Sequence, residues 1–307
     1  MRAAGIDVGK ANLDLAMDGE SGVARFANNR AGIAKLVKRL VAMGAERIVV
    51  EATGGYEEPL LEACCDAGLW IARVNPRQTR DFARATGELA KTDAIDARLL
   101  ALMARMFGDR LRRHVAPPVW QRELRDWLRR RGQVVVLIQA QKQQAALAPS
   151  AVRKLVARTT AALARELAAI EREIKALIEK HASPALRSSK GLGPVFQATM
   201  LALLPELGHL NRKEIAKLTG VAPMNRESGQ GQGKRRIRGG RAPVRVALYM
   251  ATLSAVRWDP LMKAHYQQLR ARGKLGKVAL VACMRKLLGI VNARRRDELR
   301  SEGLALA

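Results

Sequence analysis

Three short strand-like runs in the first 27 residues restrict the possible folds more than any other feature of the sequence. The runs cover residues 4–8, 12–17 and 23–27, and they are separated by Gly9-Lys10 and by residues 18–22. Short apolar runs joined by turns rich in Gly and Asp are typical of β-hairpins. The sequence therefore predicts a three-stranded meander at the start of the chain.

Helices and strands alternate after this meander. The spacing of apolar residues predicts, in order, a helix at 31–43, a strand at 47–50, a helix at 57–67, a strand at 70–74, a helix near 77–85 and a helix that begins at Asp93. Such alternation favours a mixed sheet flanked by helices. The order βββαβαβα resembles that of the RNase H-like fold, in which the first and fourth strands are neighbours.

Four carboxylates lie in or beside these elements, on a chain whose formal net charge is +27. Asp7 interrupts the first apolar run, Glu51 ends the strand that begins at Arg47, and Asp93 and Asp96 lie in the last helix. A carboxylate among apolar residues costs free energy unless it is compensated, and a divalent metal ion is the usual compensation. The sequence thus predicts that these four acids surround Mg²⁺, held as two ions roughly 3.5 to 4 Å apart.

Each acid also has a purely structural interpretation. Asp93 could cap its helix, with Thr92 beside it, and Asp96 could be a solvated helix acid. If the segment is helical, however, their spacing of three residues places both on one face, where they can reach the same metal site. Asp14, on the second predicted strand, is expected at the surface.

The composition favours a nucleic-acid partner. Lys and Arg number 55 against 28 Asp and Glu, and the sequence pI is near 11.2. Each basic residue placed on a phosphate releases condensed counterions. A ribosomal or histone-like binder would fit the charge equally well. No apolar run reaches the roughly 18 to 20 residues of a membrane span, and no signal-peptide pattern is visible near Met1, so a cytoplasmic, nucleoid-associated protein without a membrane partner is expected.

The remainder of the chain is predicted to be mainly helical, and three parts are expected: an α/β domain at 1–110, a helical arm at 111–185 and a C-terminal domain at 186–307. Pro117-Pro118 marks a plausible boundary. The arm contains two long helices broken at Pro149. In the second helix, apolar residues alternate four and three apart at Leu163, Leu167, Ile170, Ile174 and Leu177. This pattern fits a coiled coil or an ordinary bundle helix, so the arm is a spacer or an oligomerisation element.

The C-terminal domain contains two glycine-rich segments. Residues 188–194 and the apolar helix that follows resemble a helix-hairpin-helix, whose glycine turn lets backbone N–H groups approach a phosphate. Residues 223–236 are basic, rich in Gly and not expected to be helical. Ser228 in this segment is a candidate nucleophile. Tyr249 is the alternative hydroxyl and is expected in the core. Helices at 243–257 and 277–292 complete the prediction.

Taken together, these motifs resemble a known family over essentially the whole chain. Residues 5–10, 50–56 and 91–97 resemble the DEDD motif of the IS110/IS1111-family transposases, which are related to the Piv-type site-specific DNA invertases. Residues 191–194, 220–223 and 228–229 resemble the C-terminal transposase domain of that family. The resemblance implies a RuvC-like N-terminal domain in which Asp7, Glu51, Asp93 and Asp96 bind Mg²⁺. It also implies a nucleophilic serine, matched here by Ser228, that forms a 5′-phosphoserine link to DNA.

The resemblance further implies partners. Members act on donor and target double-stranded DNA, are guided by a structured non-coding bridge RNA, and form dimers that pair into tetramers, with the two domains of one active site coming from different subunits. The basic residues that we expect to contact nucleic acid are Lys10, Lys190, Arg226, Lys234, Arg235, Arg236, Arg238 and Arg241.

Two alternatives remain open at this point. A RuvC-like metal-dependent nuclease or junction resolvase that acts by hydrolysis would use the same four acids but give Ser228 no role. A non-catalytic protein that binds DNA or RNA would explain the positive charge but not the acids.

Overall fold

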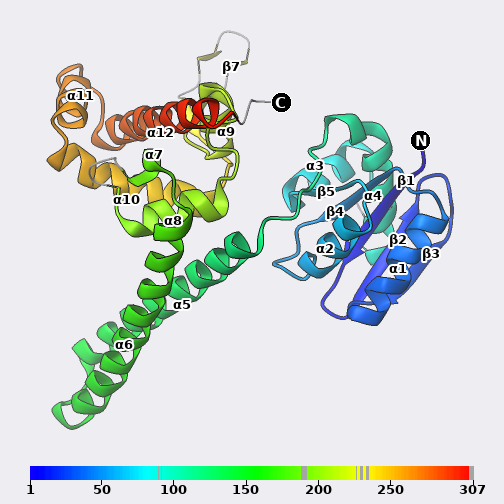
Figure 1. Cartoon of the computed structure of the whole chain (residues 1–307), viewed down its shortest axis with the longest axis horizontal. Coiled ribbons are helices and arrows are strands. Elements are labelled where there is room, and N and C mark those ends of the chain that lie inside the picture. The colour runs from blue at the N-terminus through cyan, green and yellow to red at the C-terminus, as the bar shows by residue number, and fades with distance from the viewer. Residues whose placement is uncertain are drawn as a thin grey trace. The chain divides into compact units, whose positions relative to one another are not determined.

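The computed structural model describes residues 1–88, 90, 92–187, 192–225, 227–228, 231–232 and 235–303. The chain divides into two compact units, Met1–Pro117 and Pro118–Ala307 (Figure 1). Their boundary falls at the Pro117-Pro118 dipeptide. Among the described residues, no helix combines the length and apolarity that crossing a membrane requires.

The first unit is a five-stranded sheet with helices on both faces (Figure 1). Its elements are β1 (Ala3–Val8), β2 (Asn12–Met17), β3 (Val23–Ala27), α1 (Arg30–Ala42), β4 (Arg47–Glu51), α2 (Glu58–Asp66), β5 (Ile71–Val74), α3 (Pro76–Ala85), α4 (Asp93–Phe107) and the short 3₁₀ helix η1 (Gly108–Arg110). The strand order is β3-β2-β1-β4-β5, with antiparallel pairing among β1, β2 and β3 and parallel pairing from β1 through β4 to β5. The predicted meander and alternating half are confirmed, and this mixed sheet is RNase H-like.

Alternation along the strands sorts their side chains between the two faces. Ile6, Leu13 and Ile48 pack with α1 and α2 in one core cluster. Ala3 and Val49, one residue out of phase, pack instead with residues of α4. Polar residues in that second phase must therefore lie on the α4 face of the sheet.

Helix α4 lies unusually close to β1 because β1 carries a glycine. A Cβ atom on Gly5 would stand 2.1 Å from the backbone nitrogen of Ala101 and 2.2 Å from the carbonyl oxygen of Ala97. Buried Ala16, Ala97 and Ala101 form a small cluster on this face. Because no side chain larger than a methyl group separates helix from strand here, the first turn of α4 can come close to the end of β1.

We predict that Gly5→Ala destabilises the protein by about 3 kcal/mol or more, because the new methyl group meets helix backbone that cannot rotate away. Urea unfolding measures the change. Gly22→Ala is the matched control, since its added Cβ would meet nothing within 4 Å, and its effect should stay within about 0.5 kcal/mol. Equal stability of the two variants would contradict the close contact.

The second unit is mainly helical. Its elements are α5 (Val119–Leu147), α6 (Ser150–His181), α7 (Pro184–Arg187), α8 (Pro194–Leu203), α9 (Arg212–Leu218), the short strands β6 (Pro223–Met224), β7 (Glu227–Ser228), β8 (Gly231–Gln232) and β9 (Arg236–Ile237), and α10 (Ala242–Trp258), α11 (Pro260–Ala271) and α12 (Gly276–Ser301).

Helices α5 and α6 pack against each other as a helical hairpin (Figure 1). The apolar stripe of α6, which includes Ile170 and Ile174, meets Leu124, Val134 and Ile138 of α5. Arg131 of α5 and Glu171 of α6 form an ion pair at 2.8 Å alongside it. The stripe is therefore used within the chain, in a helical hairpin whose core also includes Ala198 and Ala202 of α8.

Two details of the second unit differ from the sequence prediction. Helix α11 was not predicted, although Asp259 accepts hydrogen bonds from the backbone N–H groups of Leu261 and Met262 and Pro260 occupies the first turn. An Asp-Pro pair is a helix-start signal that could have revealed it. The prediction of Tyr249 in the core is wrong, because α10 buries the opposite face and leaves Tyr249 exposed. The turn of the predicted helix-hairpin-helix, residues 188–191, lies outside the described residues.

Candidate functional site

A row of charged side chains crosses the three antiparallel strands on the α4 face of the sheet. Asp7 of β1 is the register partner of Asp14 of β2, and Asp14 is the register partner of Arg25 of β3. Arg25 donates two hydrogen bonds to the carboxylate of Asp14, at 2.8 and 3.1 Å. Two acids opposite each other in a sheet repel, so one cation from the chain already compensates part of this row.

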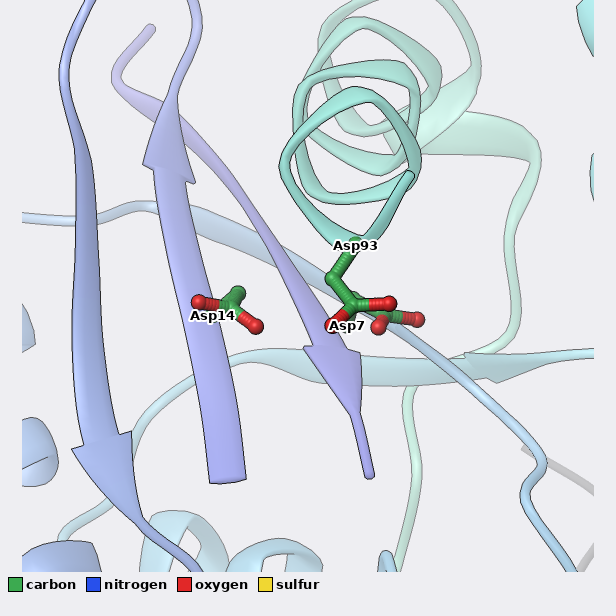
Figure 2. A group of neighbouring side chains, drawn as sticks. All are labelled: Asp7, Asp14 and Asp93. Carbon is green, nitrogen blue, oxygen red and sulfur yellow. The ribbon is translucent and has the colours of Figure 1, made fainter. Parts of the chain in front are cut away.

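Helix α4 adds a third carboxylate to the row. Thr92 is the N-cap and accepts a hydrogen bond from the backbone N–H of Ile95 at 3.2 Å, so Asp93 is the first helical residue and not the cap. Oxygen atoms of Asp7, Asp14 and Asp93 all lie within 4.8 Å of one another. Figure 2 shows Asp93 extending from the helix end toward the two strand residues. Arg25 lies 3.5 Å from Asp93.

Asp14 was predicted at the surface, and this prediction is wrong. Its side chain is only 4% exposed. The hairpin register explains the difference, because Leu13 and Leu15 face α1 and α2 while Asp14, between them, faces α4 on the same side as Asp7. The sequence held a usable signal: pairing the predicted first and second strands across their turn places the two acids opposite each other.

Glu51 and Asp96 lie on the other side of Asp7. Strand β4 pairs in parallel with β1 up to Ile6 and Val50, so Glu51 follows in the row next to Asp7, as predicted from the fold. Glu51 and Asp96 line one pocket together with residues of α3. Both raise the pKa of Asp7 through their charge. The four predicted acids and Asp14 therefore form one electrostatic cluster.

Burial, followed by the charges of Asp96, Asp93, Glu51 and Asp14, raises the pKa of Asp7 to about 6. A half-buried carboxylate surrounded by other carboxylates holds its proton more tightly, because ionisation adds negative charge where solvent is scarce. Hard oxygen donors from several elements are the ligands that Mg²⁺ prefers. The donor set thus fits a divalent metal ion, and Asp7 with Asp93 is best placed to hold it, since Asp14 is engaged by Arg25.

The raised pKa of Asp7 predicts a pH-dependent stability in EDTA. Folding favours the protonated form, so this contribution is present below pH 4 and is lost as the pH rises toward 6. We predict that Asp7→Asn is more stable than the parent chain at pH 7 by about 1–2 kcal/mol after allowance for solvent screening, and equally stable at pH 4. Thermal unfolding across this pH range checks the prediction.

At pH 7, Mg²⁺ should make the parent chain more stable than Asp7→Asn, the reverse of the order expected in EDTA. Excess Mg²⁺ should raise the Tm of the parent chain, because an ion that binds only the folded state stabilises it, and leave Asp7→Asn unchanged. A parent chain whose Tm responds to neither pH nor Mg²⁺ would contradict the site.

The turn after Glu51 is held by a buried acid that sequence reasoning missed. The carboxylate of Glu57, in a side chain that is 3% exposed, accepts hydrogen bonds from the backbone N–H groups of Thr53 and Gly55 at 3.0 and 2.8 Å. Gly54 and Gly55 have φ values of 67° and 110°, which favour glycine. Arg73 of β5 lies 3.4 Å from Glu57. Glu57 therefore fixes the direction of the chain directly after Glu51.

We predict that Glu57→Gln destabilises the protein by about 1–3 kcal/mol, because two charge-assisted hydrogen bonds from backbone N–H groups to a buried carboxylate become neutral and the ion pair with Arg73 is lost. Glu58→Gln is the matched control. It weakens an ion pair to Arg73 at a more exposed position, which is worth roughly 0–1 kcal/mol. Urea unfolding of both variants gives the comparison, and an effect of Glu58→Gln as large as that of Glu57→Gln would refute the role of Glu57.

The other predicted site residues lie in different places. Ser228 is in β7, which pairs with β8 in the second unit with Gly231 as its register partner. Lys10 is exposed in the turn between β1 and β2, and Arg235, Arg236 and Arg238 are exposed beside β9. The guanidinium group of Arg241 donates hydrogen bonds to both oxygens of the buried Glu206 carboxylate, at 2.6 and 2.7 Å. Arg241 therefore has a structural role. Lys190, Arg226 and Lys234 lie outside the described residues.

The RNase H-like sheet with an acid cluster at the ends of β1 and β4 defines a class of metal-dependent nucleic-acid enzymes. The family model for IS110-type DEDD transposases, described as "Transposase", matches residues 4–147. A second model, described as "Transposase IS116/IS110/IS902 family", matches residues 183–267. The chain belongs to the IS110/IS116/IS902 family of transposases.

Individual relatives agree with this assignment. An IS110 protein of 43.6 kDa from Streptomyces coelicolor is 31% identical over 137 residues, which cover 42% of this chain and 33% of that protein. An IS900 protein of 42 kDa from Mycobacterium paratuberculosis is 32% identical, covering 52% of this chain and 42% of that protein. The chain thus matches less than half the length of either. The pilin gene-inverting protein of Moraxella bovis is 26% identical over 93% of both chains.

Among solved structures, RuvC from Thermus thermophilus in complex with a Holliday junction substrate matches 37% of this chain and 99% of its own chain, at 15% identity and a TM-score of 0.31. The RNase H-like assignment rests on the strand order and directions of the sheet itself.

Proposed function

We propose that this protein is a DNA recombinase of an insertion sequence, which cuts donor and target DNA and rejoins the ends through a covalent phosphoserine intermediate. The observation that carries this proposal is the cluster of Asp7, Asp14 and Asp93, whose oxygens lie within 4.8 Å of one another in a chain of the IS110 transposase family. A purely structural role would not explain why this many carboxylates gather at one place, where a single arginine, Arg25, contacts Asp14 and Asp93.

The acids hold and orient the metal. Asp7, Asp93, Glu51 and Asp96 would bind Mg²⁺, while Arg25 holds Asp14 in place through two hydrogen bonds. Divalent ions bound there would polarise a scissile phosphate and lower the pKa of an attacking hydroxyl. Glu57 keeps the turn after Glu51 in place, so that the ligand geometry does not depend on a mobile loop.

Ser228 would supply the attacking hydroxyl. Its oxygen bonds to the phosphorus, the bond from phosphorus to the 3′ oxygen breaks, and the serine proton passes through solvent to that 3′ oxygen. The products are a 5′-phosphoserine link and a free 3′-hydroxyl. Attack by the 3′-hydroxyl of another strand then restores the phosphodiester and the serine, so that no bond energy is lost to hydrolysis.

A guide RNA and a multimer complete the proposal. The net charge of +27 suits a protein that holds two DNA duplexes and a structured RNA by their backbones. We propose that Ser228 and the acids of one active site come from different subunits of a dimer, and that dimers pair into a tetramer.

We predict that Ser228→Ala abolishes covalent adducts between protein and DNA and that Asp7→Asn does so as well, the first because the nucleophile is gone and the second because the metal site is lost. The full chain, with the RNA that copurifies with it, is incubated in Mg²⁺ with DNA that spans the ends of the element, and adducts are resolved by denaturing electrophoresis. Ser301→Ala, which alters an exposed serine near the end of α12, is the control and should keep the adduct.

Other outcomes would point elsewhere. Nicks with free 5′-phosphate ends in both the parent and Ser228→Ala would indicate a hydrolytic nuclease or junction resolvase. Adducts that persist in Ser228→Ala would move the nucleophile to another residue. Sequencing the copurified RNA tests the guide: a discrete structured species encoded beside the gene supports it, and a heterogeneous cellular mixture contradicts it.

A further inference from the structure

A pocket beside the acid cluster has one wall formed by the ends of β4 and α4, which carry carboxylates, and another formed by α3, which carries three arginines and Asp81. Glu51, at the end of β4, and Asp96, in the first turn of α4, line it together with Arg77, Arg80 and Arg84 of α3. Residues spaced by three and then four positions lie on one side of a helix. Because Arg84 lies 3.8 Å from Asp81, the positive charge that a ligand next to Glu51 and Asp96 meets comes from Arg77 and Arg80.

The guanidinium groups at the centre of this wall are not committed to protein partners. In the part of the chain that the structure describes, the side chains of Arg77 and Arg80 form neither a hydrogen bond nor an ion pair. Arg84 contacts Asp81 on its own helix at 3.8 Å, with both side chains largely exposed, which is a weak pair. Nearby Arg73, by contrast, lies 2.7 Å from Glu58. Thus α3 holds two arginines whose binding capacity is unused.

A buried hydroxyl lines the same pocket. Thr79 of α3 is 5% exposed, and its Oγ1 has no hydrogen-bond partner among the described groups. Leaving a buried hydroxyl unpaired is unfavourable. A ligand with an acceptor oxygen in this pocket would offer the hydroxyl the hydrogen-bond partner that it lacks.

We propose that Arg77, Arg80 and Thr79 form a binding site for a phosphodiester group of the nucleic-acid strand that passes Glu51 and Asp96. The guanidinium fork matches two phosphate oxygens with parallel hydrogen bonds. A phosphodiester is also the ligand that suits both walls, because metal ions held by carboxylates and guanidinium groups each attract its oxygens. That the bound strand is the one to be cut rests on the proposed function. The affinity of the pocket for a phosphodiester group does not depend on that function.

The test measures binding without chemistry. The full chain is titrated in EDTA with a DNA duplex of mixed sequence at several salt concentrations, and fluorescence anisotropy gives Kd. For Arg77→Ala combined with Arg80→Ala, the slope of log K against log salt should become shallower by about 1, since the single phosphate contact that is lost contributes about 0.9. Arg77→Ala alone should bind DNA more weakly than the parent chain and change the slope by less than the double variant does.

The matched control is Lys38→Ala combined with Arg39→Ala. These residues are exposed on α1, whose apolar residues pack on the sheet face opposite to α4, and the change removes the same charge. The control should keep the slope of the parent chain. Equal slopes for the two double variants would overturn the proposal, and so would a loss seen with an RNA duplex but not with DNA.

The outcomes also separate this site from the proposed function. The parent chain could fail to form a DNA adduct while the α3 double variant shows a shallower slope of log K against log salt than the parent chain. In that case the phosphate site stands and the recombinase proposal fails. If adducts form in the parent chain and both slope and adduct formation survive in the α3 double variant, the phosphate site fails alone.

Discussion

The contact between the backbone of helix α4 and Gly5 is the constraint on which the rest of the N-terminal unit depends. Asp93 and Asp96 lie in the first turn of this helix, and Asp7 lies two residues beyond Gly5 on β1. Because a Cβ atom on Gly5 would stand 2.1 Å from helix backbone, any larger residue would push the helix outward. The acids would then separate, and a metal ion needs them within a few ångströms. Packing and chemistry are therefore set by the same glycine.

The acid cluster is costly, and the structure shows how the cost is limited. Arg25 neutralises Asp14 with two hydrogen bonds, Thr92 and not Asp93 caps α4, and the pKa of Asp7 is raised to about 6 by burial and its acidic neighbours. Because this pKa is about 6, a cation that binds Asp7 below pH 6 must displace a proton, whereas at pH 7 it meets a carboxylate that is mostly ionised. The remaining excess of negative charge lies next to the arginines of α3, so attraction for metal and attraction for phosphate are placed side by side.

The two units divide the proposed chemistry. The first unit carries the carboxylates and the α3 arginines, and the second carries Ser228 on a short two-stranded element among helices. The helical hairpin of α5 and α6 opens the second unit and has its own apolar core. Under the proposed function, the nucleophile and the metal site belong to separate compact units, so assembly of subunits can bring them together. Such an arrangement suits an enzyme that must act only when several DNA strands are bound.

The sequence by itself determined the order of strands and helices in the first unit and the break at Pro117-Pro118, because periodicity and turn residues are local properties. It also singled out Asp7, Glu51, Asp93 and Asp96 as candidate metal ligands. It could not determine the role of Asp14, Arg25 and Glu57. Those roles depend on which strands pair and in what register: Asp14 looked like a surface residue until β1 and β3 were placed on either side of it, and Glu57 became a buried anchor only when the turn after Glu51 folded back on it. The pocket shared by Glu51, Asp96 and the α3 arginines likewise joins three segments far apart in sequence. Local sequence patterns determine the secondary-structure elements. Only tertiary packing decides which charged side chains come into contact and how strongly solvent screens their interactions.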